Sequence, residues 1–189
     1  MPEEPAKEDS FLYPVFFDLR GRRCVVIGGG GVATRKALEL ARAGAEVVAV
    51  APCVGPEIMR VCREVRERPY RSGDLDGAFL AFAATDSREV NRAVAEEAHR
   101  RGIPVNVADR PAEGDFFLPS VLRRGPLQIA VSTSGASPAL ARSIRRQLEG
   151  LFGREWEDLV RRVGETRRLG EHDEGLEEEV RACLSRLRG

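Results

Sequence analysis

A run of four glycines between an apolar segment and an amphipathic one constrains the fold of this chain more than any other feature. The apolar residues 24–27 are rich in β-branched side chains, which predicts a buried parallel strand. The glycines follow directly, and a second apolar run, residues 46–50, comes after the amphipathic segment. This order predicts a βαβ unit whose first turn is made of glycine.

The spacing within this turn, Gly28-x-Gly30-x-x-Ala33, fits the fingerprint of a dinucleotide-binding site. Gly28 permits a tight turn out of the strand, and Gly30 leaves room for a pyrophosphate to approach the backbone. Ala33 is small enough for the helix to pack on the sheet. The helix N-terminus offers unpaired N–H groups and the positive end of its dipole to phosphates. We therefore expect a nucleotide at this turn; the alternative is a glycine turn that binds nothing.

The end of the second strand does not identify the dinucleotide. NAD-binding folds usually end this strand with Asp or Glu, which holds the ribose hydroxyls, whereas an arginine accommodates the extra phosphate of NADP. This chain has Ala51, Pro52 and Cys53 there. The motif alone therefore leaves NAD and NADP open, and the ribose must be held by backbone groups or by residues from elsewhere in the chain.

The composition of the chain argues against several classes of function. The chain has 189 residues with 30 basic and 30 acidic side chains, so its zero net charge gives no electrostatic case for binding nucleic acid or membranes. Its four cysteines are scattered, and its two histidines form no metal-ligand pattern with them. No apolar run is long enough to span a membrane, and the acidic, proline-bearing start is unlike a signal peptide. We expect a reduced, cytoplasmic protein.

The pattern through residue 107 predicts a doubly wound α/β fold with a parallel sheet. Thr85 and Asp109 each follow an expected strand, so both should lie at the carboxyl edge of the sheet, beside the glycine turn. Residues 1–10 are expected to form a disordered lead, and residues 11–112 a Rossmann-type NAD-binding domain. The elements expected after the βαβ unit are a helix over 56–64, a polar strand near 66–70, a buried strand over 78–84, a helix over 87–101 and a strand over 102–107.

The remainder of the chain has a different pattern. A basic helix reaching about residue 152 should begin at Ser137, which fits the N-cap, with Pro138 at the first helical position. We expect a small α+β region over 113–152 and a helical region over 153–189. The other expected elements are a turn over 123–126, a strand over 127–132, a loop of small residues over 133–138, and two charged helices with apolar stripes over 155–163 and 174–187.

Several segments together resemble the siroheme synthase N-terminal family. They are YPVFFDLRGRRCVVIGGGGVATRKALELARAGAEV, FAATDSREVN, VNVADRP and FFLPSVLRRGPLQIAVSTSGASPALAR, in matching order and spacing from about Tyr13 to Phe152. The family consists of precorrin-2 dehydrogenases, several of which are also sirohydrochlorin ferrochelatases. The resemblance implies NAD-dependent oxidation of precorrin-2 to sirohydrochlorin, followed in bifunctional members by insertion of ferrous iron or cobalt. It also implies a Rossmann-type domain, a dimerisation region and a helical C-terminal part, usually in a homodimer.

The resemblance also assigns roles to individual residues. Asp109 matches the family's aspartate that serves both reactions, as a proton-handling or metal-guiding carboxylate; it would be a transient metal contact, and no permanent metal is expected. Considered without the resemblance, Asp109 is a turn former before Arg110 and Pro111. The cofactor contacts expected from the fingerprint, the sheet edge and the resemblance are Gly28, Gly30, Gly31, Val32, Ala33, Pro52, Cys53 and Thr85.

Precorrin-2 is a flat macrocycle with eight carboxylates, which arginine side chains are well suited to hold. The expected substrate contacts are Arg142 and Arg145 on the basic helix and Ser132, Thr133 and Ser134 in the family's serine-rich loop. For each arginine, a solvated surface position is the alternative. The chain lacks the methyltransferase module of the longest relatives, so we expect a separate methyltransferase to supply precorrin-2. Further candidate arginines are Arg123, Arg124 and Arg146.

Three other functions remain open. The chain could be a non-catalytic NAD-binding sensor or regulatory module that contacts a partner through its C-terminal helices. It could be a dehydrogenase of another small molecule, which would need a base such as histidine or tyrosine at the motif-bearing edge. It could also be an accessory protein that binds the macrocycle and passes it on.

Overall fold

The computed structural model describes residues 12–187, so the expected disordered lead of residues 1–10 lies outside it. The described residues form two compact units, one ending at Phe117 and the other beginning at Leu118. This division falls a few residues after position 112, where the sequence analysis placed the end of the Rossmann-type domain. Among the described residues, no helix is both long and apolar enough to cross a membrane.

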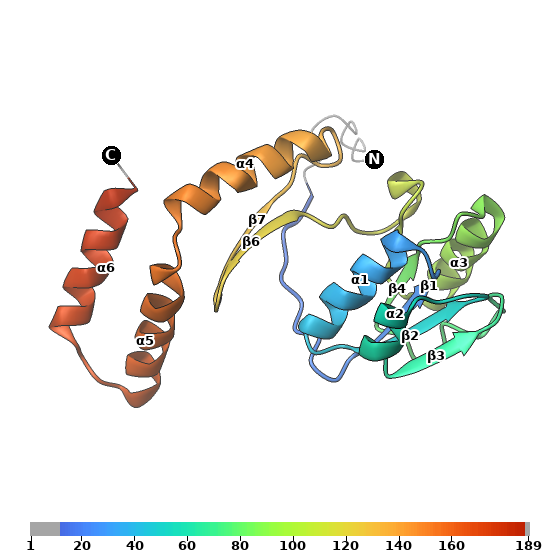
Figure 1. Cartoon of the computed structure of the whole chain (residues 1–189), viewed down its shortest axis with the longest axis horizontal. Helices are drawn as coiled ribbons and strands as arrows, with labels where there is room; N and C mark the ends of the chain where they lie inside the picture. The colour runs from blue at the N-terminus through green and yellow to red at the C-terminus, as the bar shows by residue number, and fades with distance from the viewer. Residues whose placement is uncertain (1–11, 188–189) are drawn as a thin grey trace, which may run out of the picture. The chain divides into compact units, whose positions relative to one another are not determined.

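The first unit is built on a five-stranded parallel sheet, as predicted, in the order β3-β2-β1-β4-β5 (Figure 1). Every strand is short, and the three central ones are almost completely buried because helices cover both faces of the sheet. The strands are β1 (Arg23–Ile27), β2 (Glu46–Ala51), β3 (Glu64–Glu67), β4 (Leu80–Ala83) and β5 (Val105–Val107).

Two separate cores lie on the two faces of the sheet. The first contains Ala33 and Ala37 of α1 (Gly31–Arg42) and Ile58 of α2 (Pro56–Val61), so these helices cover one face. The second contains Val94 and Ala98 of α3 (Arg88–Arg101), which covers the other face. A 3-10 turn, η1 (Pro111–Glu113), follows β5. The predicted doubly wound fold is therefore confirmed.

The edge of the sheet differs in detail from the prediction. Helix α2 stops at Val61 instead of near residue 64, because the backbone N–H of Arg63 already donates to Val47 O in the sheet at 2.9 Å. As a result β3 starts at Glu64, earlier than the predicted polar strand near 66–70. The strand ends before Pro69, which has no N–H to give to a ladder.

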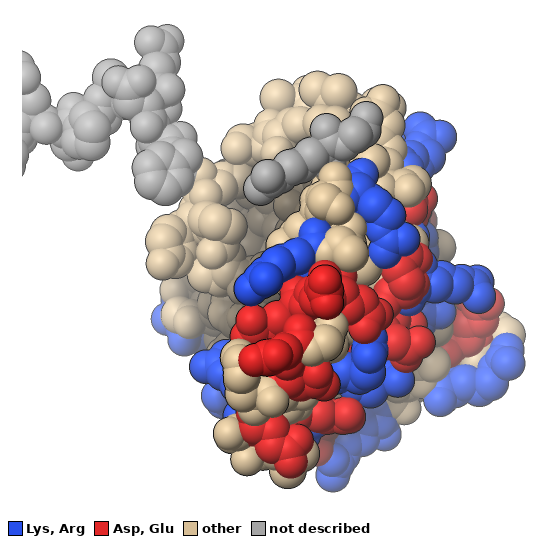
Figure 2. All heavy atoms as spheres, turned by 90° about the vertical axis from the view of Figure 1, so that its left-hand side faces the viewer, with Lys and Arg blue, Asp and Glu red and all other residues tan. Residues whose placement is uncertain are grey.

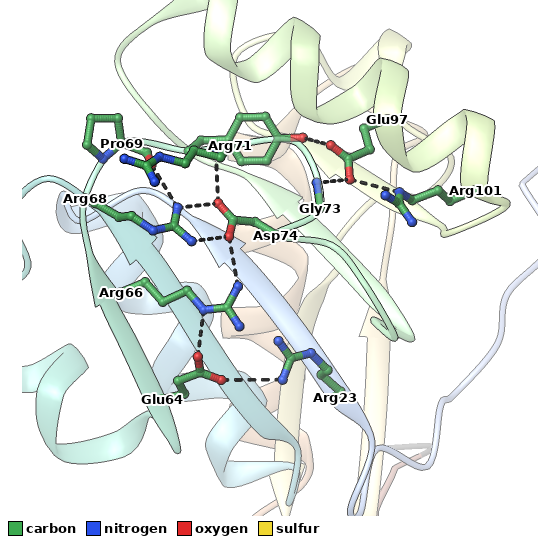
Figure 3. A network of polar contacts seen from close by, with 11 residues as sticks. Arg23, Glu64, Arg66, Arg68, Pro69, Arg71, Gly73, Asp74, Glu97 and Arg101 are labelled. Carbon is green, nitrogen blue, oxygen red and sulfur yellow. Dashed lines mark hydrogen bonds and ion pairs between the residues drawn. The ribbon is translucent and has the colours of Figure 1, made fainter.

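The connection from β3 to β4 has no helix and is held by two buried carboxylates instead (Figure 3). Asp74, only 3% exposed, accepts hydrogen bonds from the guanidinium groups of Arg68 and Arg66 at 2.6–2.8 Å. Glu97 of α3, 2% exposed, accepts from the Gly73 N–H at 2.9 Å and from the Tyr70 hydroxyl. These contacts fix a long irregular connection against the sheet and α3.

The segment before β1 packs only at its end. Leu19 is buried, and the ring of Phe17 lies edge-on to Phe79 with centroids 5.6 Å apart. By contrast, Tyr13 and Phe16 are 82% and 66% exposed.

In the second unit an antiparallel hairpin of β6 (Ser120–Arg124) and β7 (Leu127–Val131) packs on α4 (Pro138–Leu151). Strand β6 was missed in the sequence, where a turn was expected over 123–126; the turn itself contains only Gly125 and Pro126. Arg124 instead lies at the end of β6 and donates from Nε to Phe152 O at 2.7 Å, satisfying a carbonyl at the end of α4.

Two further helices, α5 (Glu155–Leu169) and α6 (Glu174–Arg186), share a small core around Trp156 and Leu159. Helix α5 runs past residue 163, its predicted end, because Gly164 is tolerated inside it. The helix ends at Leu169 and is followed by the C-cap Gly170, which has a φ of +69°. Figure 2 shows the side of the second unit that carries α5 and α6, where acidic side chains gather with basic ones around them.

We predict that Asp74→Ala lowers the free energy of unfolding by about 3 kcal/mol at pH 7, because it leaves the partly buried guanidinium group of Arg68 without its carboxylate and takes from Arg66 one of its two. Hydrogen bonds from Arg68, above all, hold the pKa of Asp74 well below its usual range. The contribution of Asp74 is therefore complete above about pH 4 and is lost as the pH falls below that value. Urea unfolding followed by circular dichroism at neutral and acidic pH measures both effects.

Asp76→Ala in the same connection is the matched control. Asp76 pairs with Arg101 but its side chain is 67% exposed, so its loss should cost less than about 1 kcal/mol. Equal losses for the two variants would contradict a special role of the buried carboxylate.

Candidate functional site

The turns that follow four of the parallel strands meet at the carboxyl edge of the sheet. Backbone hydrogen bonds continue past the strands: Gly28 N donates to Val50 O at 2.9 Å, Ala84 N to Ile27 O at 2.8 Å, and Ala108 N to Ala83 O at 2.9 Å. The glycine turn, Thr85 and Asp109 are therefore brought to one edge, as the sequence predicted. Ligands of open α/β sheets bind at this edge.

The glycines of the turn have two different physical roles. A Cβ on Gly28, whose φ is +137°, would lie 2.2 Å from Ala84 O, and one on Gly29 would lie 1.9 Å from Cys53 O. These two positions must be glycine for the backbone to fit, and the sequence fingerprint did not single out Gly29. A Cβ on Gly30 or Gly31 would meet nothing within 4 Å. The open space therefore begins at Gly30.

Helix α1 begins at this open space and has no side-chain cap. Its N-cap is Gly30, with an extended backbone, so the first N–H groups of the helix have no side-chain acceptor. Ala33 is fully buried against the sheet, while Pro52 and Cys53 at the end of β2 are exposed beside the glycine turn. An uncapped helix N-terminus behind an open glycine backbone suits the pyrophosphate of a dinucleotide.

Asp109 projects from the end of β5 with its side chain 35% exposed. One carboxylate oxygen, Oδ1, accepts a hydrogen bond from Asn91 Nδ2 at 2.8 Å. The other, Oδ2, lies 3.9 Å from Arg88 Nε, and Arg88 also pairs with Glu113. The Asp109 side chain thus bonds to α3, and among residues 12–187 it makes no side-chain hydrogen bond to the turn that follows it.

Asn91 and Arg88 were not predicted as site residues. Both come from the first turns of α3, and Asn91 is 1% exposed. A signal was present in the sequence, because Asn91 occupies the same helix face as Val94, Ala95 and Ala98. A polar side chain in an apolar stripe must find a hydrogen-bond partner when the helix packs.

Thr85 was predicted to contact the cofactor, and its hydroxyl makes local hydrogen bonds. The hydroxyl oxygen lies 2.8 Å from Asn91 Oδ1 and 3.0 Å from Ser87 O. Ser87 in turn caps α3 by accepting from Val90 N at 3.3 Å. Thr85 therefore organises the turn between β4 and α3.

Lys36 of α1 forms a second polar contact that the sequence analysis missed. Its Nζ donates to Asn106 Oδ1 at 2.6 Å and lies 5.3 Å from the centroid of the Phe82 ring. Burial lowers the pKa of Lys36 to about 8. Asn106 Nδ2 donates to Phe116 O at 2.9 Å, so the pair ties α1 to the chain that leaves the first unit.

The predicted substrate residues lie in the second unit. Ser132 Oγ accepts from Ser134 N at 3.1 Å, and Thr133 Oγ1 accepts from Ser137 N at 3.0 Å, so both hydroxyls shape the loop before α4. Arg145 forms an ion pair with Glu149 one turn along the helix. Arg142 is exposed and has no hydrogen-bond or ion-pair partner among the described residues. Within residues 12–187, no three His, Cys, Asp or Glu side chains gather as a metal site would require.

We predict that Gly30→Ala folds as the wild type does but binds NAD about tenfold more weakly or worse, because the new methyl group occupies the space that the pyrophosphate needs. The backbone of Gly30, with φ −79° and ψ −177°, accepts alanine without strain. Calorimetric titration with NAD and a thermal melt measure the two properties. Gly164→Ala is the control: Gly164 is an equally open glycine in α5, and its substitution should leave NAD affinity unchanged. Equal NAD affinities in the two variants would show that Gly30 is not part of the NAD-binding surface.

Comparison with known proteins identifies the two parts of the chain. The family described as Putative NAD(P)-binding matches residues 15–120, and the family described as Sirohaem biosynthesis protein central matches residues 124–151. A solved structure described as SirC, precorrin-2 dehydrogenase, is similar with a TM-score of 0.73 and 31% sequence identity, over 84% of this chain and 80% of that one.

Curated relatives carry the same combination of segments. The siroheme synthase of Methylobacillus flagellatus is 47% identical over 143 residues, which are 74% of this chain and 31% of that protein. The siroheme synthase of Chromobacterium violaceum is 45% identical over 154 residues, 79% of this chain and 33% of that protein. The chain thus spans about a third of the length of these relatives. With an NAD(P)-binding domain followed by the sirohaem central segment, the chain belongs to the siroheme synthase N-terminal family.

Proposed function

We propose that this chain is a precorrin-2 dehydrogenase of siroheme synthesis, which uses NAD to oxidise precorrin-2 to sirohydrochlorin. The observation that carries the proposal is the Asp109 carboxylate, partly exposed at the same sheet edge as the open glycine turn. The likeness to a solved precorrin-2 dehydrogenase and to siroheme synthases supports the choice of substrate.

NAD would be held by the glycine turn and the start of α1. The backbone N–H groups of Gly31, Val32 and Ala33 are free of side-chain caps and suit the phosphates. Gly30 leaves the space for them, and Pro52 and Cys53 are exposed beside the turn. When bound, NAD supplies the acceptor for a hydride.

Asp109 would handle the proton of the reaction. Oxidation of the macrocycle removes a hydride, which leaves with its electron pair, and a proton from carbon or nitrogen. A carboxylate at the edge can accept that proton as the C–H or N–H bond breaks. Oδ1 is already engaged by Asn91, so Oδ2 is the oxygen available to form the new O–H bond.

The macrocycle's carboxylates would be bound by basic groups of the second unit, with Ser132, Thr133 and Ser134 contributing from the loop before α4. Of the arginines on α4, Arg142 has a guanidinium group without a partner within residues 12–187, whereas Arg145 must share its own with Glu149. The side of the unit that carries α5 and α6 is less suited to an acidic substrate, because several of its arginines pair with glutamates such as Glu179 and acidic side chains gather there (Figure 2).

The proposal extends to assembly and to a second reaction. We propose a cytoplasmic homodimer that receives precorrin-2 from an upstream methyltransferase. We further propose insertion of ferrous iron or cobalt into sirohydrochlorin, with Asp109 as the carboxylate that takes up pyrrole protons and contacts the metal in transit. A non-catalytic NAD-binding regulator, or a carrier of the macrocycle, is the competing function.

We predict that Asp109→Ala leaves NAD affinity near the wild-type value but lowers the rate of oxidation by about a hundredfold or more, because the proton acceptor is lost. An anaerobic assay with enzymatically generated precorrin-2 and NAD follows sirohydrochlorin and NADH together by their visible and near-ultraviolet spectra. Added ferrous iron or cobalt then tests insertion.

Asp86→Ala is the control, since Asp86 is an exposed carboxylate at the end of β4 on the same edge. Its turnover should match the wild type. A wild-type protein that binds NAD but yields neither product would support the regulator or carrier instead, and unchanged turnover in Asp109→Ala would exclude this carboxylate from the reaction.

We predict that Arg142→Gln raises KM for precorrin-2 roughly fivefold without changing KM for NAD, because one charge-assisted contact worth about 1 kcal/mol is lost. Arg145→Gln should have a smaller effect, since Glu149 already occupies that guanidinium group. Arg161→Gln on α5, whose arginine pairs with Glu157, should change neither constant. Initial rates at varied precorrin-2 concentrations measure these constants. Equal KM values for all three variants would show that Arg142 is a solvated surface residue that does not bind the substrate.

A further inference from the structure

We propose that Asn91 is a positioning residue for the dehydrogenation: it holds the Asp109 carboxylate so that Oδ2 faces the reacting substrate. This inference rests on the proposed function. Asn91 acts through Asp109 and is itself buried, 1% exposed, beneath the edge of the sheet.

Every hydrogen-bonding position of the Asn91 amide is used. Its Oδ1 accepts from Thr85 N at 3.0 Å and lies 2.8 Å from the Thr85 hydroxyl oxygen. Its Nδ2 donates to Thr85 O at 3.0 Å and to Asp109 Oδ1 at 2.8 Å. An amide has two donors and two acceptor positions, so rotation of this side chain would leave several buried groups unpaired. The direction of the donor toward Asp109 is therefore fixed.

The Asn91 amide joins three consecutive elements. Thr85 follows β4, Asn91 lies in the first turns of α3, and Asp109 follows β5. The N-terminus of α3 is itself anchored, since Ser87 caps it and Asn91 N donates to Ser87 O at 3.0 Å. Through Asn91, the Asp109 carboxylate is thus held by the backbone of Thr85, just after the neighbouring strand β4.

The two oxygens of Asp109 are placed in unequal surroundings. Oδ1 accepts a hydrogen bond from the Asn91 amide, whereas Oδ2 accepts none from the described residues and has Arg88 Nε 3.9 Å away, and Arg88 is anchored by Glu113 on η1. With Oδ1 engaged, the O–H bond forms at Oδ2 as the substrate C–H or N–H bond breaks, and the hydride passes to NAD. Misplacing a reacting group by even about 1 Å can cost a hundredfold in rate.

A purely structural role for Asn91 makes a different prediction. If Asn91 only fastened α3 to the sheet, its three contacts with Thr85 would be its whole role. Any variant that loosens this end of α3 would then lower activity as much as the loss of Asn91 does. The variants must therefore separate loss of the Asp109 contact from loss of helix stability. Ser87→Ala offers that separation, because it removes the cap of the same helix without touching Asp109.

The experiment measures kcat and KM for both substrates across pH for the wild type, Asn91→Ser, Asn91→Asp and Ser87→Ala. We expect Asn91→Ser to lower kcat by about tenfold or more while KM for NAD stays within about twofold, which is the signature of lost positioning. Asn91→Asp should also shift the acid limb of the pH profile upward, because it sets a second carboxylate beside Asp109 and near Arg88 and Glu113. Ser87→Ala should lower only the melting temperature.

The outcomes are distinct. Wild-type kcat and an unshifted profile in Asn91→Ser would overturn the inference while leaving the dehydrogenase intact, and so would a loss of kcat in Ser87→Ala as large as that in Asn91→Ser. If Asn91→Asp does not fold, the kcat and KM values of Asn91→Ser decide. A wild-type protein that forms no sirohydrochlorin refutes the proposed function, and the inference with it.

Discussion

The close approach of two glycines to neighbouring strand ends is the constraint on which this site depends. The backbones of Gly28 and Gly29 lie against the carbonyl oxygens of Ala84 and Cys53, leaving no room for a Cβ at either position. Because β1 is the middle strand, this contact sets the turns after β2 and β4 relative to the start of α1. The open backbone at Gly30 and the uncapped N-terminus of α1 follow directly on this tight turn.

Electrostatic contacts, and not a helix, hold the connection between β3 and β4 in place. The connection from β3 to β4 would ordinarily bury an apolar helix face, and here it buries Leu75 together with Asp74 and the contacts to Glu97. Each carboxylate is satisfied by several donors at once, which is the condition under which a buried charge is tolerated. The edge strand β3 is thereby tied to α3, the helix that also carries Asn91 and Arg88.

Local chemistry was predictable from the sequence, and contacts between distant residues were not. The buried strands, the Ser137 cap and the position of Asp109 at the sheet edge follow from patterns within a few residues. Strand β6 was missed because only Leu122 of its residues is buried, so it shows little apolar periodicity. The contact of Asn91 with Asp109 and the burial of Lys36 beside Asn106 depend on residues 18 and 70 positions apart, which no local pattern reveals.

The Asn91 amide connects residues that all belong to one continuous β4-α3-β5 segment. Closing such short loops costs little conformational entropy, so this part of the edge can assemble with its own supersecondary unit. The surroundings of the Asp109 carboxylate are thus encoded in a single contiguous stretch of chain. Both side chains that contact this carboxylate, Asn91 and Arg88, come from that stretch, so its immediate surroundings are set within one supersecondary unit.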